Sequence, residues 1–293
     1  MKTRLAIAAA AAALLAAGAA QAKGPEVEIK DAVARVVVIP EDRTDIKVEI
    51  VPAANRELPT LEVRRTGSGK LVIDGGLRRR IRGCSGGNSR AEGPAPLNGL
   101  QGVTVRVRDI GEVRMSDTAL VTIRTPRNVN VDAGGAVFGW VGRAESVALS
   151  NAGCGDWTIA DVRGRLAASI AGSGDVRIGS TGSLSADIAG AGDVVAGPTG
   201  SLEVSIAGAG DVQVARVNGS IEASIAGAGD VRVRGGRPTT VEASIAGAGS
   251  VIVDAPVTDV DASIVGAGDV EVQSVSGRVS KSILGAGSVR VGG

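Results

Sequence analysis

The sequence predicts an all-β fold: a single-stranded parallel β-helix of about ten coils of 18–20 residues, preceded by short N-terminal strands. The first observation behind this prediction is a phrase, Ser-Ile-Ala-Gly-Ala-Gly-Asp-Val, that recurs through the C-terminal half. Its Gly-x-Gly returns every 18–20 residues, which suits one turn of a solenoid and is too short for a propeller blade. The first glycines of the copies are Gly153, Gly172, Gly190, Gly208, Gly227, Gly247, Gly266 and Gly285.

The second observation is the alternation of side chains within one repeat. Every second residue of 221–225 is aliphatic, whereas Glu222 and Ser224 point to the opposite side. After the glycine corner, Val231 and Val233 continue the aliphatic side. Coils stacked about 4.8 Å apart would bury these columns against one another. We favour a right-handed path, because the aliphatic residues do not recur at every sixth position, as left-handed hexapeptide helices require.

The third observation is composition. The chain has 44 glycines but one Phe, two Trp, no Tyr and no His, which predicts a narrow interior of Val, Ile, Leu and Ala. Without Lys2 and Arg4 of the export signal described next, 30 basic residues face 31 acidic ones, so we expect no nucleic-acid partner. The segment from Gly67 to Lys70 lacks the first glycine and the Ser or Thr of a phosphate-binding loop, and we expect no cofactor.

Residues 1–22 read as a signal peptide. Lys2 and Arg4 form a basic start, an apolar stretch follows, and Ala20-Gln21-Ala22 is a small-x-small cleavage site. We therefore expect an exported protein that is periplasmic, outer-membrane-associated or extracellular. The apolar stretch is short for a bilayer span, so we expect no membrane span after cleavage, and a retained anchor is the alternative.

Residues 23–102 are expected to form an N-terminal β region of the same domain, with an Arg/Gly-rich loop at 75–100. The repeat β-helix is expected over 103–293, because 103–107 alternates and 113–123 aligns with a later copy of the phrase. Prolines and glycines separate the predicted N-terminal strands, which are 33–39, 45–51, 61–65 and 70–73.

The segment from Gly102 to Ser116, followed by copies of Ile-Ala-Gly-Ala-Gly-Asp-Val, resembles the head GIN domain family of auto-transporter adhesins, a domain of unknown function. The resemblance covers about residues 27–293. It implies a bacterial envelope or surface protein whose β-helix is an adhesin-head-like binding or structural module. The family has no catalytic motif to carry over, and the 75–100 loop departs from it as an insertion.

A row of aspartates follows the Gly-x-Gly corners. Neighbouring carboxylates about 4.8 Å apart repel by roughly 0.9 kcal/mol in water, whereas a hydrogen bond to a corner amide contributes about 1.5–3 kcal/mol. Ser250 and Ser288 keep the acceptor oxygen in the same slot, so we predict a turn-capping ladder and no metal, with Ca²⁺ binding as the alternative. The ladder residues are Asp156, Asp175, Asp193, Asp211, Asp230 and Asp269.

A second acidic ladder, Glu203, Glu222, Glu242 and Asp261, lies on an outward face and gives a polysaccharide-active enzyme some support. Against it, the chain has no His and almost no aromatic residue to stack a sugar ring. Identical residues in successive coils indicate a scaffold. We therefore expect no enzyme; this enzyme and a self-assembling structural protein remain the alternatives.

The predicted binding surface combines residues 134–157 with the 75–100 loop. Trp140 and Trp157 lie where the repeat is least regular, and filling a wider interior is the alternative role for them. The loop carries a cluster of arginines that could bind an anionic envelope polymer, or could be merely solvated. The cluster is Arg78, Arg79, Arg80 and Arg82.

Cys84 and Cys154 are the two cysteines of the chain, and in an oxidising compartment they predict a disulfide that fixes the loop to a coil. At the other end, Lys281 takes a slot that Ala243 and Ala262 fill in earlier coils. An inward charge blocks edge pairing, so we expect a monomer whose partner is an unknown envelope polymer or protein.

Overall fold

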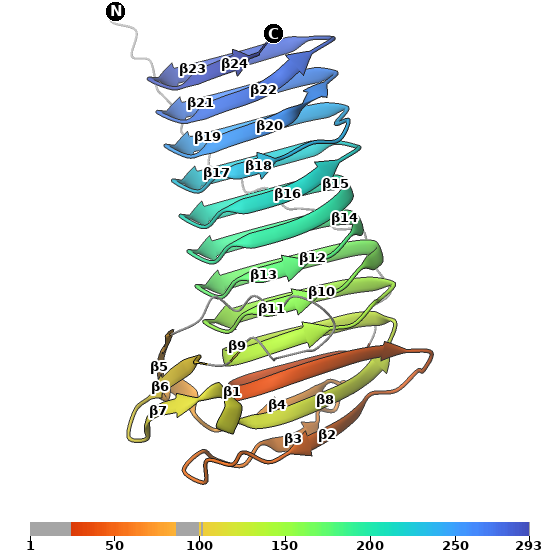
Figure 1. Ribbon diagram of the computed structural model, residues 1–293, viewed down its shortest axis with the longest axis vertical. Coiled ribbons are helices and arrows are strands. Elements are labelled where there is room, and N and C mark those ends of the chain that lie inside the picture. Colours follow the sequence, from red (N-terminus) through yellow and green to blue (C-terminus); the bar gives the residue numbers. More distant parts are fainter. Residues whose placement is uncertain (1–24, 86–99, 101, 293) are drawn as a thin grey trace, which may run out of the picture.

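The computed structural model describes residues 25–85, 100 and 102–292. Among them almost all regular structure is β (Figure 1), and the predicted all-β solenoid is confirmed. The predicted signal peptide, residues 1–22, and residues 86–99 of the predicted loop lie outside the described residues.

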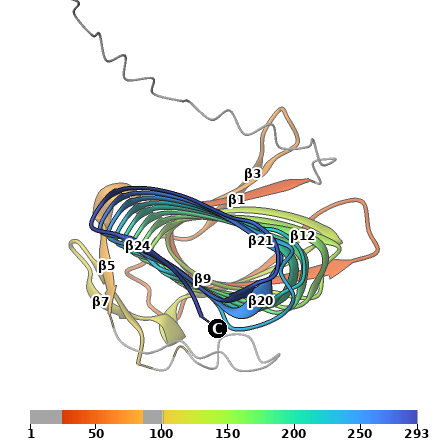
Figure 2. The ribbon, with the colours of Figure 1, turned by 90° about the horizontal axis from the view of Figure 1, so that it is seen from above.

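Nine turns stack within the described residues from Asn128 to Val291. Each turn has two arms joined by a glycine corner, and each arm pairs, parallel and in register, with the same arm of the next turn. Seen down the axis, the turns superpose as flattened loops (Figure 2). Their strands are β9 (Asn128–Val141), β10 (Ser146–Gly153), β11 (Trp157–Ile159), β12 (Val162–Gly172), β13 (Val176–Ile178), β14 (Thr181–Gly190), β15 (Val194–Gly208), β16 (Val212–Val217), β17 (Ile221–Gly227), β18 (Val231–Val233), β19 (Thr240–Gly247), β20 (Ser250–Val257), β21 (Asp259–Gly266), β22 (Asp269–Val275), β23 (Val279–Gly285) and β24 (Ser288–Val291).

The interior of the solenoid consists of the aliphatic columns that the alternation predicts. Ile221, Ala223 and Ile225 are at most 1% exposed, and Val231 and Val233 are 0% exposed. Burying one such Val or Ile side chain contributes about 1.5–3 kcal/mol. Since every turn repeats these positions, the columns form one continuous core along the axis.

The corners explain why the phrase contains two glycines. Gly208 has φ +150°, and a Cβ there would lie 2.1 Å from the carbonyl oxygen of Gly190 in the turn below. A Cβ on Gly210 would lie 2.2 Å from the carbonyl oxygen of Gly192 and 3.0 Å from Ile188 Cγ2. Consecutive backbones therefore approach so closely at the corner that no side chain fits at either position.

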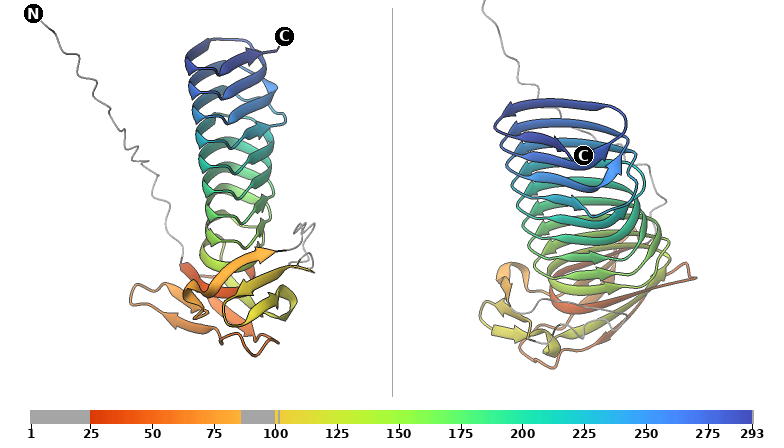
Figure 3. Two further views of the ribbon diagram at one scale, coloured as in Figure 1. Left: turned by 90° about the vertical axis from the view of Figure 1, so that its left-hand side faces the viewer. Right: turned by 45° about the horizontal axis from the view of Figure 1, so that its top comes forward.

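The N-terminal strands form a cap on the first turn, at one end of the solenoid (Figure 3). Strand β1 (Glu26–Glu41) follows both arms of β9, because 26–29 pair with 130–133 and 32–38 pair with 135–141. On its other side, the first half of β1 pairs in parallel with β4, and the second half pairs in parallel with β8. Strand β3 then pairs antiparallel with β4, and β2 pairs antiparallel with β8. The other cap strands are β2 (Lys47–Val51), β3 (Glu62–Arg65), β4 (Leu71–Asp74) and β8 (Ala119–Pro126).

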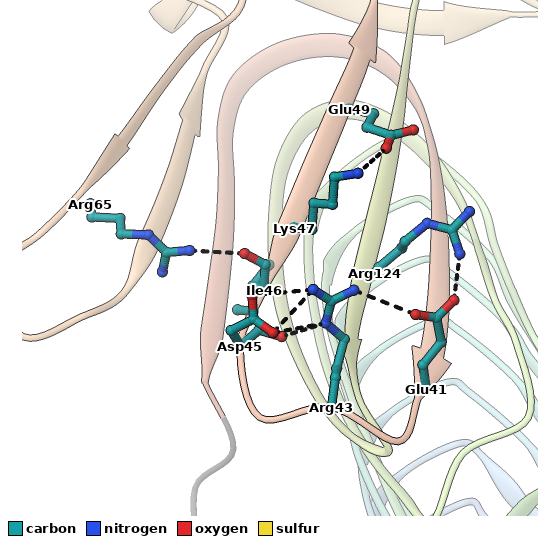
Figure 4. A network of polar contacts seen from close by, with 8 residues as sticks. All are labelled: Glu41, Arg43, Asp45, Ile46, Lys47, Glu49, Arg65 and Arg124. Atoms are coloured by element: carbon teal, nitrogen blue, oxygen red, sulfur yellow. Dashed lines mark hydrogen bonds and ion pairs between the residues drawn. The ribbon is translucent and has the colours of Figure 1, made fainter.

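Polar contacts join the cap strands (Figure 4). Glu41, at the end of β1, accepts hydrogen bonds from Arg124 of β8 and from Arg43 of the following turn. Arg65 of β3 donates to the carbonyl oxygen of Ile46 at 2.9 Å. Exposed ion pairs contribute little individually, so the backbone pairing of β1 supplies most of the attachment of the cap.

The predicted start of the repeat at residue 103 is wrong. Strands β5 (Ile81–Ser85), β6 (Thr104–Val107) and β7 (Gly111–Arg114) form a separate three-stranded antiparallel sheet. Asp109 and Gly111 adopt φ of 67° and 94°, and this geometry reverses the chain between β6 and β7. An alternating pattern suits a hairpin as well as a coil, which is why the described solenoid has nine turns rather than about ten.

Two short 3₁₀ helices flank this small sheet: η1 (Arg78–Arg80) precedes β5, and η3 (Met115–Asp117) follows β7. Part of the predicted 75–100 loop is therefore regular structure.

At the far end of the solenoid, β23 is exposed along its length, with Leu284 72% exposed. Lys281 lies in register with Ala262, in the column that the sequence predicts for it.

The corner geometry predicts that Gly210→Ala lowers the free energy of unfolding by more than about 2 kcal/mol, because the added Cβ meets backbone that cannot move alone. Urea unfolding followed by circular dichroism measures this change. Ala209→Ser is the matched control, since residue 209 is exposed in the same corner. Equal stability of the Gly210 variant and the wild type would contradict the close approach of the turns.

Candidate binding site

The outward side of β9 carries a row of apolar residues, Ala136, Phe138 and Trp140. Ala136 and Phe138 are buried in a core that they share with Val105 of the small sheet and Met115 of η3. Trp140 lies two residues further along the strand and stays partly exposed. The indole is thus a large apolar surface at the margin of the covered region.

Trp140 lines a pocket of ≈ 570 Å³ on the flank of the solenoid. Trp140, Thr158 and Arg177 occupy the same outward column in three successive turns, so the in-register pairing places them side by side. The second corner of each turn supplies the remaining wall. The lining residues are Trp140, Arg143, Thr158, Ile159, Ala160, Asp161, Arg177, Ile178 and Gly179.

The indole ring of Trp140 lies close to Gly142. A Cβ on Gly142 would lie 3.2 Å from Trp140 Cη2 and 3.0 Å from Pro40 Cδ. Both the ring and the proline therefore lie close to Gly142, where a side chain would meet them, and the indole also lines the pocket. Arg143, next in the chain, extends from this platform with its side chain 84% exposed.

The charged groups of the pocket are unequally engaged. Asp161 Oδ1 accepts hydrogen bonds from the Ser180 N–H at 2.9 Å and from Ser180 Oγ at 2.8 Å. The backbone bond, followed by the hydroxyl bond, lowers the pKa of Asp161, so the carboxylate is ionised at neutral pH. Arg143 Nε lies 3.8 Å from Asp161 Oδ2. Within the described residues, Arg177 makes no hydrogen bond or ion pair.

Trp157, the other predicted binding residue, cannot contact a ligand, and that prediction is wrong. Its side chain is 1% exposed and lies in the inward column with Val176. A Cβ on Gly139 would lie 2.3 Å from the Trp157 ring, so the glycine makes room for the indole in the core. In the described part of the chain its Nε1 has no hydrogen-bond partner. Trp157 fills the interior, which was the alternative role.

The predicted arginine cluster does not join Trp140 in one pocket. Arg78 and Arg79 are exposed on η1, and Arg82 is exposed on β5. Arg80 donates to the carbonyl oxygen of Arg108 at 3.2 and 3.3 Å and helps to hold the β6–β7 hairpin. None of these arginines is among the residues that line the Trp140 pocket.

Cys84 of β5 and Cys154 of a glycine corner form a disulfide, with their Cα atoms 5.8 Å apart. The bond links residues 70 positions apart in the chain and attaches the small sheet to the second turn. Both cysteines also pack against the core that covers Phe138. The disulfide therefore helps to set how far the small sheet covers the outward side of β9.

The aspartate ladder bonds one turn to the next. Asp193 Oδ1 accepts the N–H of Asp211 at 2.9 Å, and Asp211 Oδ1 accepts the N–H of Asp230 at 2.9 Å. Asp156, Asp175, Asp230 and Asp269 accept in the same way from the residue above. Among the described residues, no three His, Cys, Asp or Glu side chains are placed to hold a metal ion.

A second set of such bonds, at the other corner, was missed. Asp161 accepts from the Ser180 N–H, and Asp259 accepts from the Arg278 N–H at 2.7 Å. The sequence shows no regular spacing here, because the second corner varies in length. On the outward face of the first arm, Glu203, Glu222, Glu242 and Asp261 stack in register as predicted.

The register defines the protein class as a capped single-stranded parallel β-solenoid. Residues 61–238 match the family described as "Putative auto-transporter adhesin, head GIN domain". This match covers more than half of the sequence, so the chain belongs to that family, as the resemblance indicated. A search of curated proteins finds no match. No helix of the described residues is long and apolar enough to span a membrane.

Three solved structures are similar to the chain. Two are from Parabacteroides distasonis ATCC 8503: a "putative adhesin" (14% identity, 91% of this chain and 92% of that chain, TM-score 0.48) and a "Putative lipid binding protein" (15%, 92% and 94%, 0.40). The third is a "putative adhesin" from Bacteroides fragilis NCTC 9343 (14%, 92% and 93%, 0.37). Because these TM-scores are below 0.5, the description of the fold depends on the strand register.

The ladder predicts opposite outcomes for two substitutions at residue 211. Asp211→Ala removes the acceptor of the Asp230 N–H and should lower the free energy of unfolding by about 1–3 kcal/mol. Asp211→Asn keeps an oxygen in place and should retain most of the stability. Urea unfolding of both variants measures the difference, and equal losses would show that the inter-turn bond contributes nothing.

Proposed function

We propose that this protein is an exported, non-catalytic module of the cell envelope or cell surface that binds a partner through the Trp140 pocket. The observation that supports this most is the pocket itself, where the partly exposed indole of Trp140 lies beside two arginines, Arg143 and Arg177. Binding sites are concave and mostly apolar, with a few placed polar groups. Trp and Arg are also the residues that most often dominate the energy of an interface.

The location of the pocket within the repeat favours recognition. On the outward side of the first arm the same residue types recur from turn to turn, as Glu203, Glu222 and Glu242 do. The outward column of the second arm, which contains Trp140, changes residue at each turn. The Trp140 pocket lies in the first turns, where cap, small sheet and solenoid meet. A partly exposed Trp in an outward position suits a binding surface, because Trp is enriched among the residues that dominate interface energies.

Export and the lack of catalysis are parts of the same proposal. The predicted signal peptide and the Cys84–Cys154 disulfide both suit an oxidising compartment outside the cytoplasm. The described lining of the pocket contains one carboxylate, Asp161, which already accepts two hydrogen bonds. Glycoside hydrolysis needs a pair of carboxyl groups across the scissile bond. In this proposal the protein is a monomer, and its partner is a polymer or protein of the cell envelope.

Cosedimentation of the purified protein with isolated bacterial cell envelopes tests the proposal. Trp140→Ala should weaken binding by at least about 10-fold, because the indole supplies the largest apolar contact of the pocket. Val195→Ala is the matched control, since Val195 is exposed in the same column three turns further on. Absence of binding by the wild type, or equal binding by the Trp140 variant, would contradict the proposal.

A further inference from the structure

We infer that the Trp140 pocket takes an acidic sugar, a pyranose ring that carries one carboxylate, as in uronic-acid polymers. This inference rests on the proposal that the pocket is the binding site of the protein. Three properties of the pocket support it: the flat indole of Trp140, the guanidinium of Arg177, which makes no hydrogen bond within the described residues, and the net charge of the lining residues.

The indole of Trp140 offers a fixed planar surface. The face of an aromatic ring carries partial negative charge, and the C–H groups on the face of a pyranose carry partial positive charge. A sugar ring therefore stacks on such a face and keeps its hydroxyl groups at the rim. The ring lies against Gly142, where an added Cβ would come within 3.2 Å of it.

Arg177 supplies the donor for a carboxylate. In the outward column Thr158 lies one turn beyond Trp140, and Arg177 lies one turn beyond Thr158. The Arg177 side chain is half-buried. Among the residues that the structure describes, it makes no hydrogen bond or ion pair. Burial raises the pKa of the Asp175 carboxyl, and the positive charge of Arg177 acts against this rise. A planar guanidinium binds a carboxylate through two parallel hydrogen bonds, a geometry that an ammonium group lacks.

The net charge of the pocket favours a single negative charge on the ligand. Arg143 and Arg177 are cationic, and Asp161 is anionic because its hydrogen bonds lower its pKa. The lining therefore carries one excess positive charge. One carboxylate balances it, whereas a basic peptide would be repelled and a neutral sugar would leave Arg177 unpaired. The volume of ≈ 570 Å³ falls in the range of small-ligand pockets.

Isothermal titration with defined polymers tests the inference. The probes are polygalacturonate and alginate, which carry carboxylates on differently configured sugars, and methyl-esterified polygalacturonate, which keeps the rings without the charge. We expect binding to at least one acidic polymer, and at least 10-fold weaker binding of the ester relative to polygalacturonate if that polymer binds. Trp140→Ala and Arg177→Gln should each weaken acidic binding by about 10-fold or more.

Arg232→Gln is the matched control, because Arg232 occupies the same outward column three turns further on, outside the pocket. It should bind like the wild type. Circular dichroism of all variants checks that the solenoid is intact. Raising the salt concentration should weaken acidic binding, since the Arg177 contact is electrostatic.

The outcomes separate this inference from the proposed function. Equal affinity for polygalacturonate and its ester, binding of neither acidic polymer, or full binding by Arg177→Gln would overturn the acidic-sugar assignment. The proposed function would still stand if cell-envelope binding remained sensitive to Trp140→Ala. Loss of that sensitivity would overturn the proposed function itself.

Discussion

The close backbone contact at the glycine corner is the constraint on which the rest of the structure depends. At each corner the residue between the two glycines donates to the first glycine of the turn below, as Ala209 does to Gly190 at 2.9 Å. The missing side chains allow this approach, and the approach fixes the register of both arms. Once the register is fixed, inward positions lie over inward positions, and the aliphatic core and the aspartate ladder follow.

Register also creates the candidate site. Trp140, Thr158 and Arg177 are distant in the sequence and become neighbours because each occupies the same slot of its turn. The cap and the small sheet then decide which outward side chains stay accessible. Phe138 is buried in the core that the small sheet shares with β9, whereas Trp140 is partly exposed and lines the pocket.

The regular part of this fold was predictable because its periodicity is local. The alternation of inward and outward residues also places the Trp157 side chain in the interior of the solenoid. Trp157 follows Asp156 in the position that Val176 and Val212 occupy in other turns. The rarity of Trp in the sequence favours a binding role for Trp157, whereas its place in the alternation favours the core. The sequence does not indicate Arg177 as a site residue, because an outward Arg in a repeat is ordinary. Only the structure shows that Arg177 and Trp140 line the same pocket.

Other features depend on contacts that local patterns do not specify. Residues 104–114 alternate as a coil does, but period-two alternation does not distinguish a hairpin from a parallel turn. Strand β1 pairs with residues of β8 that lie 85 positions further along the chain and with residues of β9 that lie 103 or 104 positions further, and its own sequence does not specify those partners.

Amide hydrogen exchange at the corners tests the central claim most directly. If the turns contact one another as described, the N–H groups of Ala191, Ala209 and Ala228 should be protected as strongly as those of the adjoining arms. Exchange of these three amides at the rate of an open loop would contradict the account, because the corners would then not bond the turns together.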